Sequence, residues 1–256
     1  MQKFSHITTR IRDLGNNNYC ISSMWHATGA CEDRTIAEFP LKQTKSPILF
    51  KKLILNGPHI HTGNPLFKTP NNPCKSKGDW VPVDLNIISD DFIPRCKYHQ
   101  QCDDQTFADR QTKCSWDNQS FSNHWKLSYR SLVSIDGERS LQCAIYPPGV
   151  SHINNIDSIV IKDKSQLPTL TGLFSSLPED AYLKLLAKPK LHVSIIESLP
   201  ISDYGIRNSA VRIRALALNC LTKTYSSFWE ENFSEKFQRD SWTQQHMGIQ
   251  KDFFSR

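Results

Sequence analysis

The apolar positions up to about residue 165 fall into short runs, the pattern that is typical of β-strands. Four such runs lie between polar segments, at 19–25, 47–56, 81–88 and 156–161. Four prolines between residues 58 and 73 exclude a continuous helix or central strand there, because proline lacks the backbone amide donor. We therefore expect short strands joined by long loops, with residues 103–121 as a polar excursion.

A hairpin is the best-defined pair of strands in the sequence. An Asp-Gly turn signal at 136–137 separates two strand-like runs, 124–135 and 138–146, as in a tight hairpin. The first run alternates apolar and polar side chains: Trp125, Lys126, Leu127, Ser128, Tyr129 and Arg130. This alternation predicts one apolar face and one polar face, with Arg130 pointing away from the core. The Pro-Pro pair at 147–148 then ends the second strand.

Beyond residue 167 the apolar spacing becomes helical. Pro178, followed by two acidic residues, is typical of the first turn of a helix. Residues 191–201 return to strand character, or to an apolar loop edge. A last helix is expected from about Asn208 to Trp229, where apolar residues recur every three or four positions. The pattern predicts an α+β fold, with a mixed or antiparallel sheet in residues 1–165 and a mainly helical part in 166–256.

The composition is that of a folded chain. Hydrophobic residues make up 38% of the 256 residues, charged residues make up 22%, and there are six tryptophans, whereas disordered chains have few aromatics. No apolar run approaches the roughly 18 residues of a spanning helix, and the first residues lack a signal-peptide pattern. We therefore expect a cytoplasmic protein with no membrane partner.

The charge is positive and unevenly distributed. The net charge of +6 favours an anionic partner. Residues 39–78 contain no acidic residue but seven lysines, which are Lys42, Lys45, Lys51, Lys52, Lys68, Lys75 and Lys77. This segment is therefore expected to form a positive lobe.

Two groups of residues are candidates for binding an anion such as DNA. In the proline-rich segment, lysines interleave with amide, imidazole and aromatic side chains, a mixture that contacts phosphates and base edges. The candidates there are Asn64, Lys68, Lys75 and Lys77. Arg130 and Arg139, in the hairpin, form the second group. The alternatives are a solvated loop that keeps the chain soluble and an ordinary surface arginine pair.

A third positive group lies near the start of the last predicted helix, where cations oppose the helix dipole. It consists of Arg207, Arg212 and Arg214. A nearby anion would offset that cost, and either a DNA phosphate or an internal carboxylate such as Asp203 could supply it.

The eight cysteines are expected to be reduced thiols, because the sequence has no secretory signal. Zinc is the sharper alternative, because three cysteines lie close together with two histidines nearby: Cys96, Cys102, Cys114, His99 and His124. Structural zinc sites usually present their ligands in tight pairs, and no C-x-x-C pair occurs. We therefore expect no metal site.

The motifs of several enzyme classes are missing. Adenine methyltransferases need a glycine-rich loop for S-adenosylmethionine and an Asn/Asp-Pro-Pro-aromatic loop for the flipped base. Here Tyr146 precedes the Pro-Pro pair, Asn64-Pro65 is followed by Leu66, and no close G-x-G occurs. The G-x-S-x-G elbow of serine hydrolases is also missing. We therefore assign no catalytic residue, although a short and degenerate nuclease motif stays an alternative.

Several passages resemble one family in their order along the chain. Residues 129–150, YRSLVSIDGERSLQCAIYPPGV, resemble a passage in the C-terminal target-recognition region of large adenine-specific DNA methyltransferases, including Type IIG restriction-modification enzymes. Residues 19–25, 57–70 and 90–95 look similar to upstream passages of that family, and RALALNCLTKTYSSFW resembles a downstream helix. The resemblance covers most of the chain.

The resemblance implies a DNA-reading module that follows a catalytic domain in longer relatives. Residues 1–165 would form the target-recognition domain. The partners would be double-stranded DNA and a methyltransferase catalytic subunit or domain, in a restriction-modification or phage-defence system. S-adenosylmethionine would belong to that catalytic partner, and this chain would hold no cofactor.

Two other hypotheses stay open at this stage. The chain could be a nuclease whose site is not recognisable in the sequence. It could also be a protein-interaction module, or an inactive fragment of a split methyltransferase, in which the helical part docks a partner.

Overall fold

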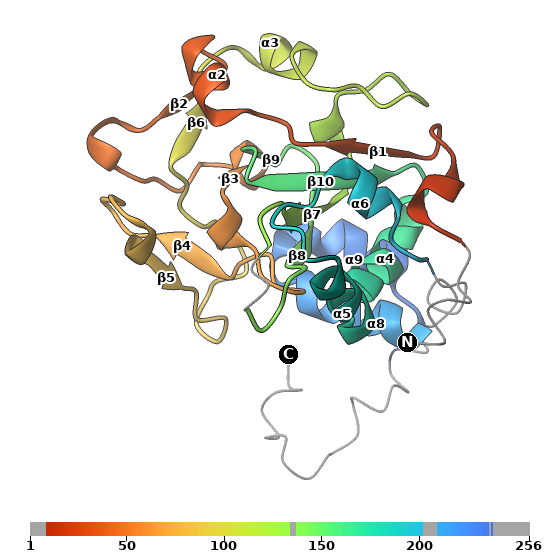
Figure 1. The fold of residues 1–256 in the computed structure, drawn as a ribbon. Helices are drawn as coiled ribbons and strands as arrows, with labels where there is room; N and C mark the ends of the chain where they lie inside the picture. The colour runs from red at the N-terminus through yellow and green to blue at the C-terminus, as the bar shows by residue number, and fades with distance from the viewer. Residues whose placement is uncertain (1–8, 134–136, 202–208, 236, 238–256) are drawn as a thin grey trace.

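A four-stranded antiparallel sheet forms the centre of the molecule (Figure 1). The computed structural model describes residues 9–133, 137–201, 209–235 and 237. The strand order is β1-β10-β7-β8, and the strands span Tyr19–Ser22, Ile156–Ile161, Lys126–Arg130 and Cys143–Tyr146. Helices dominate the C-terminal half, so the predicted α+β fold is confirmed.

The predicted hairpin is present as β7 and β8. Its register pairs Lys126 with Tyr146 and Tyr129 with Cys143, so paired residues are equidistant from position 136. A two-residue Asp-Gly turn at 136–137 would place this centre midway between the two residues, so the observed register differs from the predicted one by one residue. Residues 134–136 lie outside the described part of the chain. The second strand ends at Tyr146, directly before the Pro-Pro pair, as expected. Both strands are shorter than the runs that predicted them.

One face of the sheet is covered by the C-terminal helices. They are α4 (Leu167–Phe174), α5 (Leu177–Leu186), α6 (Val193–Glu197), α8 (Ser209–Asn219) and α9 (Ser226–Asn232). Figure 1 shows α4, α5, α8 and α9 grouped together on one side of the sheet. The ring of Tyr129 in β7 lies 6.4 Å from that of Phe174 in α4. The main hydrophobic core therefore lies between the sheet and α4.

The opposite face of β7 is also buried, which corrects the prediction of a polar face in solvent. Lys126 and Ser128 are fully buried. The Lys126 Nζ donates to the backbone oxygens of Ser122, His124 and Pro147 at 3.4, 3.0 and 3.2 Å. Burial lowers the pKa of Lys126 from its usual 10.5 to about 7. The polar positions face a second layer of chain, because residues 110–123 cover this side of the sheet.

Small strand pairs surround the sheet. They are β2 (Ile36–Glu38) with β6 (Tyr98–Gln100), β3 (Ile54–Leu55) in parallel with β9 (Ser151–His152), and β4 (Lys68–Pro70) with β5 (Trp80–Pro82). Two short helices, α2 (Ala27–Glu32) and α3 (Asp104–Asp109), lie in the same half. Single 3-10 turns span Ile11–Leu14, Pro40–Lys42, Phe50–Lys52, Gly57–His59, Lys77–Asp79, Phe121–Asn123, Lys164–Gln166 and Lys223–Tyr225.

Four expected strands or loops take another form. The run 47–56 forms a 3-10 turn before the two-residue β3, and the run 81–88 is a strand only as far as Pro82. The polar excursion contains α3, whose first turn is capped by the Asp103 carboxylate accepting from the Thr106 amide at 2.9 Å. Residues 191–201 contain α6, a helix of five residues.

The last predicted helix is two helices. α8 ends at Asn219, whose Oδ1 accepts from the Ile145 amide at 2.7 Å. The chain then returns to the sheet, where the Tyr225 hydroxyl donates to the Ile145 carbonyl at 3.0 Å, before α9 begins at Ser226. Contacts with β8 therefore interrupt a pattern that sequence spacing alone extends into one helix.

The predicted boundary near residue 165 falls at the change from strands to helices. Residues from both sides contribute to one core, in which Leu127 and Ile159 of the sheet join Leu170 and Phe228 of the helices. Within the described residues, no helix is both long enough and apolar enough to span a membrane.

Candidate nucleic-acid interface

The loop over residues 57–70 is fixed against β8 by hydrogen bonds. The Gly63 amide donates to the Cys143 carbonyl at 2.8 Å, and the Tyr146 hydroxyl donates to the Pro65 carbonyl at 2.6 Å. Gly63 has a φ of +68°, a conformation that glycine adopts without strain. This proline-rich segment is therefore an ordered loop held beside the hairpin.

The start of this loop closely approaches Arg130 at the end of β7. A Cβ atom at Gly57 would lie 3.4 Å from the Arg130 Nε and 3.7 Å from the side chain of Asn155. The Asn155 Oδ1 accepts from the Gly57 amide at 3.0 Å, and Arg130 donates to the Gln142 Oε1 at 2.6 Å. Arg130 is half-buried, and burial lowers its pKa. Its guanidinium is thus held in one orientation at the edge of the sheet.

Four of the six predicted binding residues gather around His61. Burial lowers the pKa of His61, and the charges of Arg130, Arg139 and Lys68 lower it further, while Glu138 opposes them. An isolated backbone bridge joins His61 to Asn64. We call the following residues the His61 cluster: His61, Asn64, Lys68, Arg130 and Arg139. Two segments far apart in the sequence build it.

Two members of the cluster have structural partners. The Asn64 Oδ1 accepts from the Leu66 amide at 2.9 Å and so stabilises the turn. Arg139 donates to the Ser175 carbonyl, and its Nε lies 3.7 Å from the Asp180 Oδ1. Asp180 is itself buried. The Arg139 guanidinium therefore interacts mainly with groups inside the protein, and these contacts join the hairpin to the helices.

Lys68 keeps its ammonium group over an aromatic ring. Its Nζ lies 5.3 Å from the centroid of the Phe67 ring, which in turn lies 4.5 Å from the His61 ring. A cation over a ring face is attracted to the π-electrons but is not neutralised. Lys68 therefore contributes a positive charge beside His61.

Lys75 and Lys77 lie elsewhere, at the exposed connection between β4 and β5. The Asp79 carboxylate accepts from the backbone amides of Lys75 and Ser76, at 2.7 and 2.6 Å, and orders this connection. Both lysines are exposed, and neither forms an ion pair within the described part of the chain. We call residues 71–79 the β4–β5 tip.

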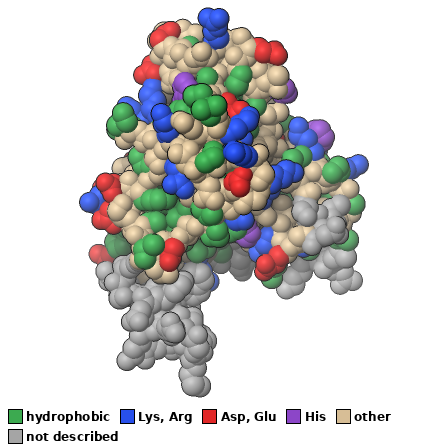
Figure 2. Space-filling model, turned by 90° about the vertical axis from the view of Figure 1, so that its left-hand side faces the viewer, with side chains coloured by type: hydrophobic (Ala, Val, Ile, Leu, Met, Phe, Trp, Pro, Cys, Tyr) green, Lys and Arg blue, Asp and Glu red, His purple; other side chains and the backbone are tan. Residues whose placement is uncertain are grey.

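Two other lysines of the acid-free segment form ion pairs with acidic residues from outside it, so the predicted positive lobe is partly neutralised. Lys42 pairs with Glu38 at 2.8 Å, and Lys52 pairs with Asp104. Acidic side chains from other parts of the sequence therefore lie next to this segment in the folded protein. Figure 2 views the side that carries β2, β4, β5 and β6, and more blue than red lies across the middle of this face.

Some contributors to this region carry no clear sequence signal. Gln142 and Asn155 orient Arg130 and the loop, but single amides are common in any sequence. His59 is buried, and its Nε2 lies 2.8 Å from the Arg95 carbonyl. Burial lowers the pKa of His59 to about 4. His59 is therefore a neutral structural residue, whereas His61 is the half-buried centre of the cluster.

The residues considered for zinc lie in separate surroundings. Cys96, Cys102 and Cys114 belong to three different apolar clusters. Among the described residues, no group of three or more His, Cys, Asp or Glu side chains is placed to hold a metal ion. Burial raises the pKa of the Cys96 thiol to about 11, so this thiol stays protonated at neutral pH.

The third positive group is only partly described. Arg207 and Asp203 lie outside the described residues. Arg212 donates to the Asn232 Oδ1 at 2.6 Å, which joins α8 to α9. Arg214 lies on α8 as well.

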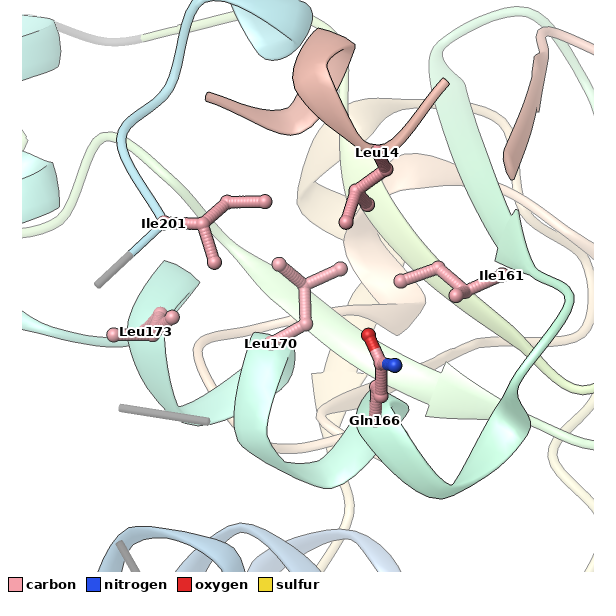
Figure 3. A pocket seen from close by; sticks show the side chains of 6 residues that line it. All are labelled: Leu14, Ile161, Gln166, Leu170, Leu173 and Ile201. Atoms are coloured by element: carbon pink, nitrogen blue, oxygen red, sulfur yellow. The ribbon is translucent and has the colours of Figure 1, made fainter. Parts of the chain in front are cut away.

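A hollow lies away from the predicted binding residues, between the first 3-10 turn, β10 and α4 (Figure 3). The side chains of Leu14, Ile161 and Leu170 converge there with Gln166. An adjoining hollow of about 390 Å³ shares Leu14, Ile161 and Gln166 and opens toward Asn18 and the charged pair 162–163. None of the six predicted site residues lines either hollow.

Comparison with known proteins identifies no relative. No protein-family model matches the sequence, and no curated protein matches it.

Proposed function

We propose that this protein binds double-stranded DNA and recognises the target for an adenine-specific DNA methyltransferase of a restriction-modification or phage-defence system. The observation that carries the proposal is the His61 cluster. Its positive side chains come from a loop and a hairpin far apart in the sequence, and both segments carry the family resemblance. The charges of Lys68, Arg130 and Arg139 all act on the same imidazole, that of His61.

The two positive regions suit different contacts with a duplex. Arg130 is oriented by Gln142 and lies beside the backbone of Gly57. A fixed guanidinium of this kind can donate two hydrogen bonds to the O6 and N7 atoms of a guanine. Lys75 and Lys77 are exposed on the tip and suit contacts with phosphates, which add affinity for any sequence.

Methyl transfer is assigned to a partner in this proposal. The chain lacks the sequence motifs that hold S-adenosylmethionine and the flipped adenine. The catalytic subunit or domain would bind that cofactor, while this chain would fix the partner at its site. The protein would work inside the cell, where DNA and partner are available.

Titration of the purified chain with a fluorescent DNA duplex at several salt concentrations tests the proposal. Because bound lysines and arginines release counterions from DNA, affinity should fall by orders of magnitude between about 50 and 200 mM salt. Absence of duplex binding at 50 mM salt, or an affinity that does not change with salt concentration, contradicts the proposal.

The same preparation distinguishes the two alternatives. Plasmid cleavage that requires Mg²⁺, and that one carboxylate substitution abolishes, would replace DNA recognition with nuclease activity. Capture of a methyltransferase subunit by a chain that binds no DNA would instead indicate an interaction module.

A further inference from the structure

Two thiols from distant parts of the chain lie side by side beneath the sheet. Cys20 is in β1, opposite Val160 of β10. Cys114 lies in the segment 110–123 that covers this face, and it packs against Val160 and Phe121 in the same apolar cluster as Cys20. Cys20 and Cys114 therefore meet in one small apolar cluster on this face of the sheet.

Hydrogen bonds on both sides of the two cysteines fix this contact. The Ser22 and Thr112 hydroxyls lie 3.3 Å apart, and the Ser115 hydroxyl donates to the Asn16 carbonyl at 3.3 Å. The turn that carries Cys114 is itself closed by two backbone hydrogen bonds of 2.9 Å, with Gln119 and Asn118. Both segments therefore hold the sulfur atoms together.

The two thiols differ in exposure and in acidity. Cys20 is half-buried, whereas Cys114 is fully buried. The interaction between the two thiols lowers the pKa of Cys20 and, together with burial, raises that of Cys114. Because a small disulfide can reach the half-buried Cys20 but not the fully buried Cys114, Cys20 is the thiol that reacts first, as the thiolate. The nearby positive charge of Lys126 favours the later ionisation of Cys114.

We propose that Cys20 and Cys114 form a reversible modification site, at which a small-molecule disulfide oxidises the pair to an intramolecular disulfide. The Cys20 thiolate attacks one sulfur of the small disulfide, which releases one small thiolate and leaves a mixed disulfide on Cys20. The Cys114 thiolate then attacks the Cys20 sulfur and releases the second small thiolate. Both cysteine protons pass to the two released thiolates, so two protein thiols are oxidised while one small disulfide is reduced to two thiols.

The disulfide would join β1, an edge strand of the sheet, to the segment that covers the buried face of β7. This modification does not depend on DNA binding. A second pair offers a comparison, because Cys31 and Cys102 also share one apolar cluster. The Cys102 Sγ, however, donates to the Thr35 carbonyl at 3.6 Å, so it is directed at the backbone.

Equilibration of the full chain with reduced and oxidised glutathione, followed by alkylation and peptide mapping, tests the proposal. We expect one cross-linked peptide pair that contains Cys20 and Cys114, and it should disappear on reduction. Cys20→Ser and Cys114→Ser should each abolish this peptide pair, whereas Cys102→Ser should leave its yield unchanged. Peptide mapping of the unsubstituted chain tests the proposal without any variant. The test can therefore be carried out even if Cys114→Ser fails to fold.

Other outcomes overturn the proposal. A Cys31–Cys102 cross-link in place of the proposed one, or eight free thiols at the most oxidising glutathione ratio, would contradict it. A persistent mixed disulfide on Cys20 that never resolves would also contradict it, because it would show that Cys114 does not reach the Cys20 sulfur.

Discussion

The His61 cluster and the β4–β5 tip are both positive, but they are built in opposite ways. In the cluster, Arg130 and Arg139 are half-buried and hydrogen-bonded to neighbouring groups. On the tip, Lys75 and Lys77 are exposed and have no ion-pair partner in the described part of the chain. Positive charge is therefore oriented by contacts within the fold in the first region and is exposed in the second. Substitutions in the two regions should separate stability, specificity and affinity.

The largest expected effect is on stability, at the support of the cluster. Asp180 is buried, and its Oδ1 accepts from the Ser140 and Leu141 amides at 2.5 and 3.3 Å, close to Arg139. Asp180→Ala leaves these donors without an acceptor, so it should lower the free energy of unfolding by about 3–5 kcal/mol. Urea titration measures this change.

Lys164→Ala, at an exposed ion pair with Glu231, is the matched control, with an expected change of about 0–1 kcal/mol. Equal effects of the two substitutions would show that Asp180 does not support the cluster.

The next effect is on sequence preference, at Arg130. Arg130→Ala should reduce discrimination between the preferred duplex and one with a changed base pair by about 1–3 kcal/mol. Competition binding with the two duplexes measures it. If the affinity for both duplexes falls equally, Arg130 contacts phosphate and the assignment of base recognition to the cluster is wrong.

A smaller effect is expected on the tip. Lys75→Gln and Lys77→Gln should each weaken binding to all duplexes and should reduce the slope of log affinity against log salt by about one. Lys188→Gln, at an exposed lysine beyond α5, should leave the slope unchanged. An unchanged slope in both tip variants would place the phosphate contacts elsewhere.

The smallest effect concerns pH. The pKa of His61 lies below its usual value of 6.5 in the folded protein, because of burial and the neighbouring cations. The unfolded chain therefore binds more protons in this range, so the contribution of His61 to stability is present above pH 6.5 and is lost as the pH falls. Nearby DNA phosphates would raise this pKa again. Duplex binding should therefore strengthen modestly between pH 7 and 5.5, and His61→Gln should remove that dependence in a binding titration.

The sequence predicted the elements whose signals are local. Residues 156–161 form a strand with the predicted bounds, because four of its six residues are Ile or Val. Pro178 lies in the first turn of α5, as its fixed φ favours. The two strands of the hairpin were also predicted, although their register differs by one residue from that of a two-residue turn at 136–137.

Elements that depend on distant contacts were not predictable in the same way. The alternation in β7 indicates two faces, but it cannot show that residues 110–123 bury Lys126 on the polar one. The break after Asn219 depends on its hydrogen bond to β8. Within the candidate site, the types of residue were predicted, whereas the partner Asp180 comes from a helix that only the fold brings close to Arg139.

Lysine footprinting on a DNA complex tests the central claim most directly. The chain is acetylated with and without a saturating duplex at low salt, and the rate at each lysine is read by mass spectrometry. If the His61 cluster and the β4–β5 tip bind DNA, the duplex should slow acetylation of Lys68, Lys75 and Lys77. The acetylation rate of Lys188 should not change. Equal labelling of the three lysines in both states, or protection confined to Lys188, would contradict it.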